Sequence, residues 1–222
     1  MKTAKIDCNN AKSTGKRKKR WMYGAVKRLA DILLSFLLIV ILSPFFILFS
    51  IVIFFTDFHA PIYRQERIGK NGRPFKIVKF RSMYHDAQDL EKYFSGEQLE
   101  KFQAEYKIDD DPRITPIGRF IRKFSIDELP QLFNVLIGQM SLIGPRPLTL
   151  EETYFFGEER DTLLSARPGM TGLWQVSGRN ALTYESGKRQ ECEIRYVNNA
   201  GFAMDLKVFF KTFGAVFGGK GM

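Results

Sequence analysis

The sequence SIDELPQLFNVLIGQMSLIGPRP, residues 125–147, brings two adjacent carboxylates, an apolar run and a rigid loop together in one short stretch. Asp127 and Glu128 stand at the start of the apolar run, which has the composition of a helix. The segment Gly144–Pro147, with sequence GPRP, closes the stretch, and its prolines stiffen the backbone on both sides of Arg146. A carboxylate pair beside a held guanidinium suits phosphate chemistry, because a planar guanidinium matches the oxygens of a phosphate.

Two starting points are compatible with the helix that follows the carboxylates. Ser125 and Glu128 match a capping box, which would give Glu128 a purely structural role. Pro130 would then be the fifth helical residue, where an N–H is needed. If Asp127 is the N-cap, Pro130 takes the third position, where no N–H is missed. We therefore expect the helix to begin at Asp127, where the helix dipole keeps a carboxylate ionised. A role as cap alone is the alternative.

The positive charge is concentrated at the N-terminus. Ten Lys or Arg and one acid, Asp7, fall in residues 1–28 of a 222-residue chain whose formal net charge is +10. A basic arm on a balanced domain is not typical of a nucleic-acid-binding protein, and we predict no nucleic-acid partner. We expect residues 1–20 to form a flexible basic arm beside a membrane, where each Lys or Arg near anionic lipid contributes roughly 1 kcal/mol. A solvated tail and a nucleic-acid patch are the alternatives for this arm.

An apolar run from Ile32 to Phe55 follows, and serines and one proline are its only interruptions. A straight helix of this length spans about 36 Å, which is enough for the hydrocarbon core of a bilayer. The run is too long for the apolar region of a signal peptide, and no typical cleavage site follows it. We therefore expect this segment to stay in the chain and to enter the membrane.

The centre of the apolar run carries Ser43 and Pro44. Proline removes an N–H and kinks a helix, and Ser43 could bond a carbonyl that the proline frees. Both flanks of the run are rich in Lys and Arg, and the positive-inside rule favours the cytoplasm for each. These features predict a re-entrant helix–break–helix hairpin over residues 21–56. An ordinary proline-kinked spanning helix is the alternative.

Short elements are predicted after the membrane segment. Asn71-Gly72 is a strong turn signal between two partly alternating runs and indicates a hairpin of two strands. Residues 86–107 have the spacing of an amphipathic helix, with an interruption at Ser95-Gly96. A short basic helix is expected from Ile117 to Phe124. Met204 to Phe217 predicts a last amphipathic helix, either in the core or in the membrane interface.

One lysine and four arginines are the candidate phosphate ligands: Lys79, Arg122, Arg146, Arg167 and Arg179. Three glycines near the last two would let the backbone approach an anionic ligand closely: Gly169, Gly172 and Gly178.

Other residues with metal-binding chemistry give weaker signals. The run Asp109–Asp111 before a proline is typical of a solvated loop, with a metal cluster as the alternative. His59 and His85 are the only histidines, which is too few for a hydrolase that binds its metal through histidine. Cys8 and Cys192 give neither a disulfide framework nor a zinc spacing.

The ordered motifs KFRSM, DPRITPIGRFIR, DELPQLFNVLIGQMSLIGPRP, RPGMTGLWQVSGR and DLKVFFKT resemble those of the bacterial sugar transferase family. These are the monotopic polyprenol-phosphate phosphoglycosyltransferases. The resemblance runs from about Lys27 to the C-terminus and matches the small form of the family, which holds only the catalytic core. It also implies the membrane hairpin, with its break at Ser43-Pro44, and a place on the cytoplasmic face of the bacterial inner membrane.

The resemblance further implies a reaction. Asp127 would attack the sugar-bearing phosphorus of a UDP-sugar and release UMP, and polyprenol (undecaprenyl) phosphate would take the phosphosugar from the carboxylate. Glu128 would bind Mg²⁺ together with Asp127 or manage the acceptor's proton. Lys79, Arg122 and Arg146 lie in matching motifs and would contact phosphate. The product would initiate a polysaccharide or glycoconjugate, and the sequence does not name the sugar.

The chain departs from the family pattern at Glu193, where the pattern has an aspartate, and at Ala200-Gly201, where it has an aromatic residue followed by serine. Glutamate keeps the charge but displaces it by one methylene group.

The sequence thus predicts a mainly α-helical α+β fold, in which residues 57–222 form a cytoplasmic-face catalytic domain with a short β-hairpin. Its partners would be a UDP-sugar, polyprenol phosphate and the phospholipid membrane, and a homo-oligomer is an open option. A non-catalytic membrane scaffold is the alternative of another class. A ternary-complex enzyme with Asp127 as general base is the alternative mechanism.

Overall fold

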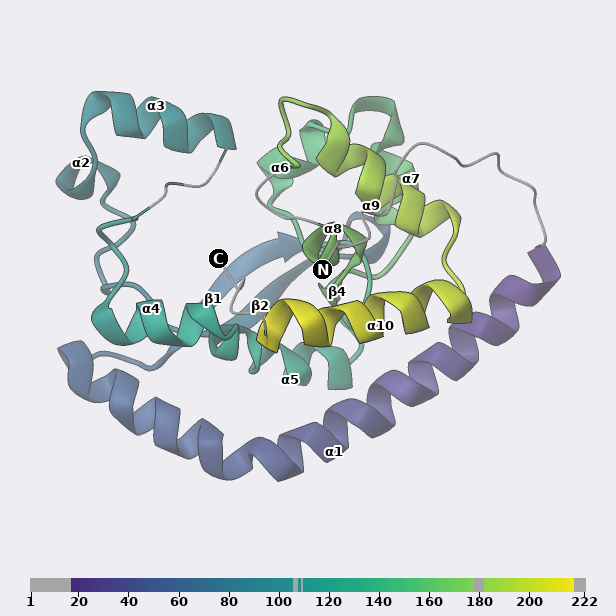
Figure 1. The fold of residues 1–222 in the computed structure, drawn as a ribbon, viewed down its shortest axis with the longest axis horizontal. Coiled ribbons are helices and arrows are strands. Elements are labelled where there is room, and N and C mark those ends of the chain that lie inside the picture. The colour runs from purple at the N-terminus through teal and green to yellow at the C-terminus, as the bar shows by residue number, and fades with distance from the viewer. Residues whose placement is uncertain (1–16, 106–107, 109, 178–181, 218–222) are drawn as a thin grey trace.

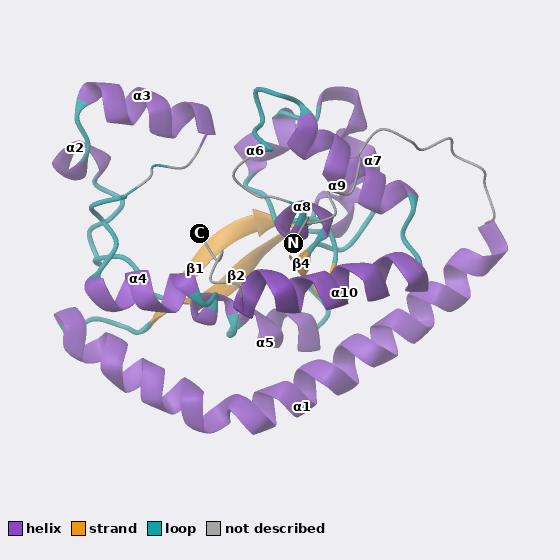
Figure 2. Ribbon diagram, in the orientation of Figure 1, coloured by secondary structure: helices purple, strands orange, loops and turns teal. Residues whose placement is uncertain are grey.

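The computed structural model describes residues 17–105, 108, 110–177 and 182–217, so nearly all of the predicted basic arm lies outside the described part. Figure 1 shows a long helix, α1, curved beneath a domain of shorter helices, and Figure 2 shows the few strands near the centre of that domain. A mainly helical α+β fold is confirmed.

The described elements, in chain order, are α1 Arg17–Asp57, β1 Ile62–Ile68, η1 Lys70–Gly72, β2 Pro74–Phe80, α2 Leu90–Tyr93, α3 Gly96–Glu105, α4 Pro116–Lys123, η2 Ile126–Glu128, α5 Gln131–Leu136, β3 Ser141–Ile143, α6 Leu150–Tyr154, η3 Gly157–Glu159, α7 Arg160–Leu164, β4 Gly169–Thr171, α8 Leu173–Val176, α9 Lys188–Asn198 and α10 Phe202–Phe217.

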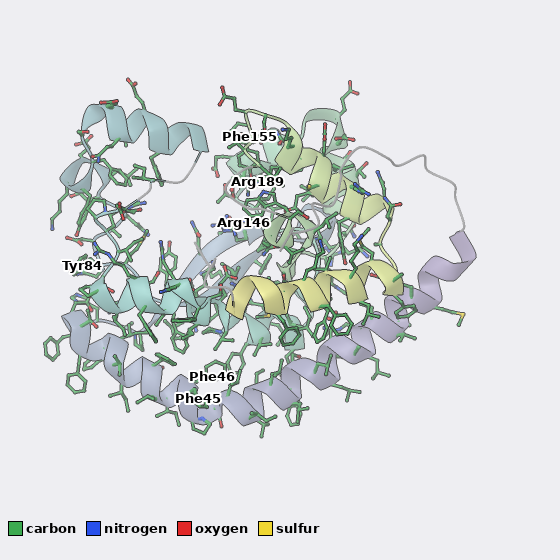
Figure 3. The ribbon with its side chains drawn as sticks, viewed as in Figure 1. Phe45, Phe46, Tyr84, Arg146, Phe155 and Arg189 are labelled. Atoms are coloured by element: carbon green, nitrogen blue, oxygen red, sulfur yellow. The ribbon has the colours of Figure 1, made fainter. Side chains whose placement is uncertain are left out.

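Helix α1 runs without interruption through Pro44. It bends in its middle, at the level of Phe45 and Phe46 (Figure 3). The hydroxyl of Ser43 donates a hydrogen bond of 2.8 Å to the carbonyl of Val40, the group that the missing proline N–H leaves free. The predicted serine contact is confirmed. The predicted break is a bend within one helix, and re-entry into a membrane stays a prediction.

Within the described residues, one helix is long and apolar enough to cross a membrane, by length and composition. It covers Met22–Asp57, and its most apolar 18-residue stretch has a mean hydropathy of 3.0 with few residues buried by the rest of the protein.

The N-terminal half of α1 is held to the domain by polar contacts. Lys27 pairs with Asp205 of α10 at 2.6 Å. The guanidinium of Arg28 donates to the carbonyls of Val135 and Leu136, at the end of α5. These contacts fix one half of α1 against the same domain that its other half touches.

The C-terminal half of α1 packs through apolar side chains. Ile53 is buried with Phe80 of β2 and Ile121 of α4, and Phe46 and Phe49 pack against this cluster. Both halves of one long apolar helix therefore lie against a single domain.

Strands β1 and β2 form the predicted hairpin, antiparallel from Ile62 opposite Phe80 to Ile68 opposite Pro74. The turn between them places Asn71 and Gly72 at φ angles of 58° and 74°, the left-handed region that the Asn-Gly signal indicated. A second pair, β3 with β4, is parallel and was not predicted.

The predicted helices near the site are confirmed with small shifts of their ends. The helix predicted over residues 86–107 is interrupted as expected and forms α2 and α3, although residues 106–107 lie outside the described part. The basic helix is α4 and the last amphipathic helix is α10. In the acidic run, Asp111 receives hydrogen bonds from the guanidinium of Arg113, so this carboxylate is already engaged.

The predicted N-cap at Asp127 is wrong. Ser125 adopts a left-handed conformation with φ of 55° and makes no side-chain cap bond, so the capping-box alternative is also absent. The chain then makes the 3₁₀ turn η2, and α5 begins only at Gln131. Pro130 immediately precedes α5, where its missing N–H costs nothing.

Candidate active site

A small cavity that is open to solvent lies between the β-hairpin, η2 and the GPRP loop. Its wall includes three residues predicted from the sequence, Lys79, Glu128 and Arg146. The lining residues are Arg67, Ile77, Lys79, Glu128, Gln131, Arg146, Pro147, Met170 and Gln175.

Asp127 lies beside this cavity in η2 and is only 8% exposed. Burial raises the pKa of Asp127 to about 6, and the charge of Glu128 adds to the rise. The charges of Lys79 and Arg122 oppose it. The carboxylate is therefore ionised at neutral pH and poorly solvated, which is a reactive state for a nucleophile.

Glu128 is tied to the hairpin by Lys79, whose ammonium lies 3.3 Å from a carboxylate oxygen. Lys79 and Ile77 are two residues apart on β2 and both reach the cavity, because alternate strand residues share a face. Strand β2 thus places the ammonium group of Lys79 beside the carboxylate pair.

Arg122 stands on α4 on the other side of Asp127. Its Nε donates a hydrogen bond of 2.7 Å to the hydroxyl of Ser82, which fixes the guanidinium. Burial lowers the pKa of Arg122, and the charge of Asp127 opposes this shift. The two groups are therefore electrostatically linked, as their closeness in sequence suggested.

The GPRP loop is rigid because it is packed against β4. A Cβ atom on Gly144 would lie 2.5 Å from the carbonyl oxygen of Arg167. The backbone N–H of Arg146 donates to Glu193 at 3.2 Å, and its guanidinium lies over the ring of Trp174.

The glycines near the GPRP loop serve backbone packing in this structure. A Cβ atom on Gly169 would lie 2.0 Å from the amide nitrogen of Gly144, and one on Gly172 would lie 2.2 Å from its carbonyl oxygen. The close approach predicted for a ligand is thus made to another backbone segment. Gly178 lies outside the described residues.

A buried ion network behind Arg146 was missed from the sequence. Glu152 of α6 binds Arg67 at 2.7 Å and Arg189 of α9 at 3.4 Å. Burial raises the pKa of Glu152, but the charges of Arg67 and Arg146 outweigh this and hold the pKa below its usual value. Figure 3 shows Arg146 and Arg189 close together in the middle of the domain. The signal available was the capping box of Thr149 and Glu152, which the structure contains.

Glu193, the departure from the family pattern, is buried under the GPRP loop. Burial raises the pKa of Glu193 to about 7, while its bond with the Arg146 N–H opposes the rise. Its second oxygen, Oε2, has no hydrogen-bond partner among the described residues. The longer side chain still reaches the loop, so Glu193 supports the position of Arg146.

The last two predicted arginines are not brought to this cavity by the described structure. Arg167 is exposed, does not line the cavity, and is near enough to Arg28 for their like charges to interact. Arg179 lies outside the described residues. The roles predicted for both stay predictions.

The carboxylate pair has the chemistry of a Mg²⁺ site. Mg²⁺ prefers oxygen ligands and is usually held by one or two carboxylates together with substrate phosphates. Glu128 lines the cavity and Asp127 is its neighbour in η2, and the mutual repulsion of the two carboxylates contributes to the raised pKa of Asp127. A divalent cation would relieve that repulsion, so these residues fit the ion.

Comparisons with known proteins agree with this geometry. The pattern of the bacterial sugar transferase family matches residues 22–219. The chain is 40% identical over 196 residues to the exopolysaccharide production protein ExoY of Sinorhizobium fredii, covering 87% of this chain and 86% of ExoY.

Two longer relatives have more specific names. The chain is 42% identical over 190 residues to the undecaprenyl-phosphate galactose phosphotransferase of Salmonella typhimurium, covering 84% of this chain and 39% of that protein. It is 35% identical over 196 residues to the UDP-glucose:undecaprenyl-phosphate glucose-1-phosphate transferase of Klebsiella pneumoniae, covering 84% and 39%.

Asp127 is buried and Glu128 is partly buried beside a cavity lined by cations, in a domain docked along one long apolar helix, and this arrangement suits an enzyme that transfers a phosphorylated group. The match to the family pattern over most of the chain makes the assignment specific. The chain belongs to the bacterial sugar transferase family.

Proposed function

We propose that this chain transfers a sugar phosphate from a UDP-sugar to polyprenol phosphate, with UMP as the second product. The observation that carries the proposal is the burial of Asp127 against Glu128, beside a cavity that Lys79, Arg67 and Arg146 line. The names of the Salmonella and Klebsiella relatives describe reactions of this kind. The product initiates the assembly of a polysaccharide or glycoconjugate.

Asp127 acts as the nucleophile in this proposal. In the first step its carboxylate oxygen bonds to the phosphorus that carries the sugar, while the bond to the UMP oxygen breaks and UMP leaves with the electron pair. In the second step an oxygen of polyprenol phosphate bonds to the same phosphorus and the electron pair returns to Asp127. Glu128 takes up the proton that the acceptor phosphate loses.

The cations around the cavity neutralise the charge of substrate and transition state. Lys79 already pairs with Glu128, and Arg146 is held in place by Glu193 and Trp174. A preorganised cation stabilises developing negative charge without the reorganisation that water requires. Mg²⁺ held by Asp127 and Glu128 would add positive charge next to the leaving phosphate.

Helix α1 enters the cytoplasmic leaflet of the bacterial inner membrane and returns, which makes the protein monotopic. This part of the proposal is supported by the docking of both halves of α1 on one domain, through Arg28 at one end and Ile53 at the other. The bend at Pro44 is the deepest point. The active site is then near the headgroups, where the phosphate of polyprenol phosphate lies.

The proposal is tested by UMP release from a panel of UDP-sugars, with purified protein, Mg²⁺ and undecaprenyl phosphate. We expect UMP from one donor sugar, which also identifies the sugar. Asp161→Asn, which changes an exposed carboxylate on α7, serves as the matched control and should retain full activity. Without UMP from any donor, the scaffold alternative would be favoured.

A second assay separates the nucleophile from the general-base alternative. The enzyme is incubated with the active donor in the absence of acceptor and analysed by mass spectrometry. We expect one phosphosugar on the peptide that contains Asp127. Stoichiometric binding of donor without a covalent adduct would favour a ternary complex, with Asp127 as base.

The rate of UMP release should fall in acid, at or below a pH of about 6. Burial raises the pKa of Asp127 to about 6 and bound Mg²⁺ would lower it, and below that pKa protonation removes the nucleophile, so the rate drops about tenfold per pH unit. Glu193, whose pKa is raised to about 7, is the competing explanation for the loss of rate in acid. Glu193→Gln removes that group, and the fall in acid should persist in this variant. Loss of the fall would assign it to Glu193.

Replacing Pro44 with alanine should change the topology of α1. The new N–H can bond Val40, so the bend loses its cause and some chains should cross the bilayer. Topology is read by an impermeant thiol reagent at Ser13→Cys and Ser95→Cys, on a Cys8→Ser background. In the parent both sites should react from the cytoplasmic side only. Phe45→Ala, which truncates the exposed side chain next to Pro44, is the control. If Pro44→Ala is labelled in the same way as the parent, the proline does not set the topology.

A further inference from the structure

The two histidines of this chain meet at the C-terminal end of α1. His59 follows α1, and His85 follows β2, yet their rings are stacked with centroids 3.9 Å apart and planes inclined by 4°. Figure 3 shows Tyr84, the residue before His85, near that end of α1 and well away from Arg146. The cluster is therefore separate from the active-site cavity, and none of its members lines that cavity.

Asp57, the last residue of α1, completes the cluster. One ligand atom each from Asp57, His59 and His85 lies within 4.8 Å of the others. Imidazole nitrogens and a carboxylate oxygen are ligands that Zn²⁺ uses at three-residue sites with a fourth, open position. Tetrahedral bonds of about 2.1 Å require ligand atoms about 3.4 Å apart. Both imidazoles are exposed, so small rotations of their rings would bring the ligand atoms from within 4.8 Å of one another to about 3.4 Å.

A hydrogen bond orients the ring of His59. Nδ1 of His59 lies 2.6 Å from the backbone carbonyl of Asp57, which can only accept, so this nitrogen carries the proton. In this tautomer the lone pair available to a metal lies on Nε2, and such orientation by a second hydrogen bond is typical of metal-binding histidines.

Asp57 has one engaged and one unengaged oxygen. Its Oδ1 pairs with Arg81, which also donates to the carbonyl of His59 at 2.9 Å. Its Oδ2 is buried and has no hydrogen-bond partner among the described residues. A buried carboxylate oxygen without a partner is costly, and a cation bound there would satisfy it. Arg81 fixes the carboxylate and leaves this oxygen for a ligand.

We propose that Asp57, His59 and His85 form a binding site for a divalent transition metal of the Zn²⁺ class. Imidazole selects Zn²⁺ and its neighbours over Mg²⁺, which takes oxygen ligands, so this site is chemically distinct from the carboxylate pair. Bound metal joins the end of α1 to the segment that leads from β2 into α2. It thereby ties the apolar helix α1 to the catalytic domain at the C-terminal end of the helix.

The test uses the untagged full-length chain in detergent, because a histidine tag would add competing ligands. Zn²⁺ is titrated in the presence of excess Mg²⁺, and binding is followed by calorimetry and by the imidazole NMR signals, of which the chain has only two. We expect one Zn²⁺ per chain, with shifts of both imidazoles. Even second-shell substitutions cost about 10- to 100-fold in metal affinity, so His59→Ala or His85→Ala should weaken binding at least about tenfold.

The control removes the thiol of Cys8, because thiolate is the other transition-metal ligand in this chain and Cys192 is buried. Cys8→Ser should leave Zn²⁺ binding unchanged, and the absorption of bound Co²⁺ should show nitrogen and oxygen ligands with no thiolate band. The histidine variants should retain UMP release with Mg²⁺ alone, since neither residue is in the cavity. The inference is overturned if Zn²⁺ binds the double histidine variant as tightly as the parent, or if the imidazole signals do not move.

Discussion

Asp127→Asn should abolish UMP release while leaving the protein at least as stable as the parent. The amide cannot form the bond to phosphorus, so we expect a loss on the order of 10³-fold or more. The amide has nearly the shape of the carboxylate, so the packing of η2 is preserved. A substitution that abolishes activity and does not lower stability indicates that the residue serves catalysis and not folding.

The sign of the stability effect follows from the pKa. The folded-state pKa of Asp127 is about 6, above the ordinary value of 3.8, so ionisation of this group opposes folding. The penalty is absent below the unfolded pKa, grows as the pH rises to about 6, and is complete above it. At pH 7 it is on the order of 3 kcal/mol, which asparagine avoids.

Thermal unfolding in detergent at pH 7 measures this effect, with Asp161→Asn as the control for an exposed carboxylate. The midpoint for Asp127→Asn should rise by several degrees, at about 2–4 °C per kcal/mol for a chain of this size. At pH 4.5, where Asp127 is protonated in the folded parent, the difference should shrink. A variant that is both inactive and strongly destabilised would instead indicate a structural role for Asp127.

Local sequence signals predicted α1, the β-hairpin, the helices from α2 to α5 and α10, but none of the elements from β3 to α9. The β1–β2 hairpin follows from Asn71-Gly72, and the interruption between α2 and α3 follows from Ser95-Gly96. The bend of α1 follows from Pro44. Each of these features depends on residues that are close in sequence, which is why a pattern could indicate them. The carboxylate pair and Arg146 were found in the same way, because they share one stretch of chain.

Features that depend on distant residues were missed. Strands β3 and β4 have three residues each and pair across a long connection, so neither run carries a strand signal of its own. Arg67 was counted only among the basic residues that flank the membrane segment. Its place in the cavity wall depends on Glu152, far along the chain. His59 and His85 were judged too few for a catalytic metal, and their contact needs the tertiary fold.

Glu152→Ala should be the most destabilising change at the site. Arg189 is buried, Arg67 is largely buried, and both bind this carboxylate, so its removal leaves two poorly solvated cations without this partner. Breaking a buried ion pair costs about 3–5 kcal/mol. At about 2–4 °C per kcal/mol, the unfolding midpoint should fall by roughly 10 °C. Glu151→Ala removes the same group at an exposed neighbouring position and should change the stability by less than about 0.5 kcal/mol.

Glu152→Gln separates charge from packing. The amide keeps one acceptor oxygen, which can still take the hydrogen bond from Thr149 N–H, and its NH2 group can donate to the Tyr184 hydroxyl, but it no longer balances the charge of Arg67. We therefore expect a smaller loss of stability than in the alanine variant, and a higher KM for the UDP-sugar, because Arg67 loses its fixed position in the cavity wall. The pKa of Glu152 is held below its usual value, so its contribution is present above the unfolded pKa and is lost as the pH falls through the folded one. The parent and Glu152→Gln should accordingly converge in stability in acid. A gap that does not depend on pH would mean that packing, and not charge, is what Glu152 supplies.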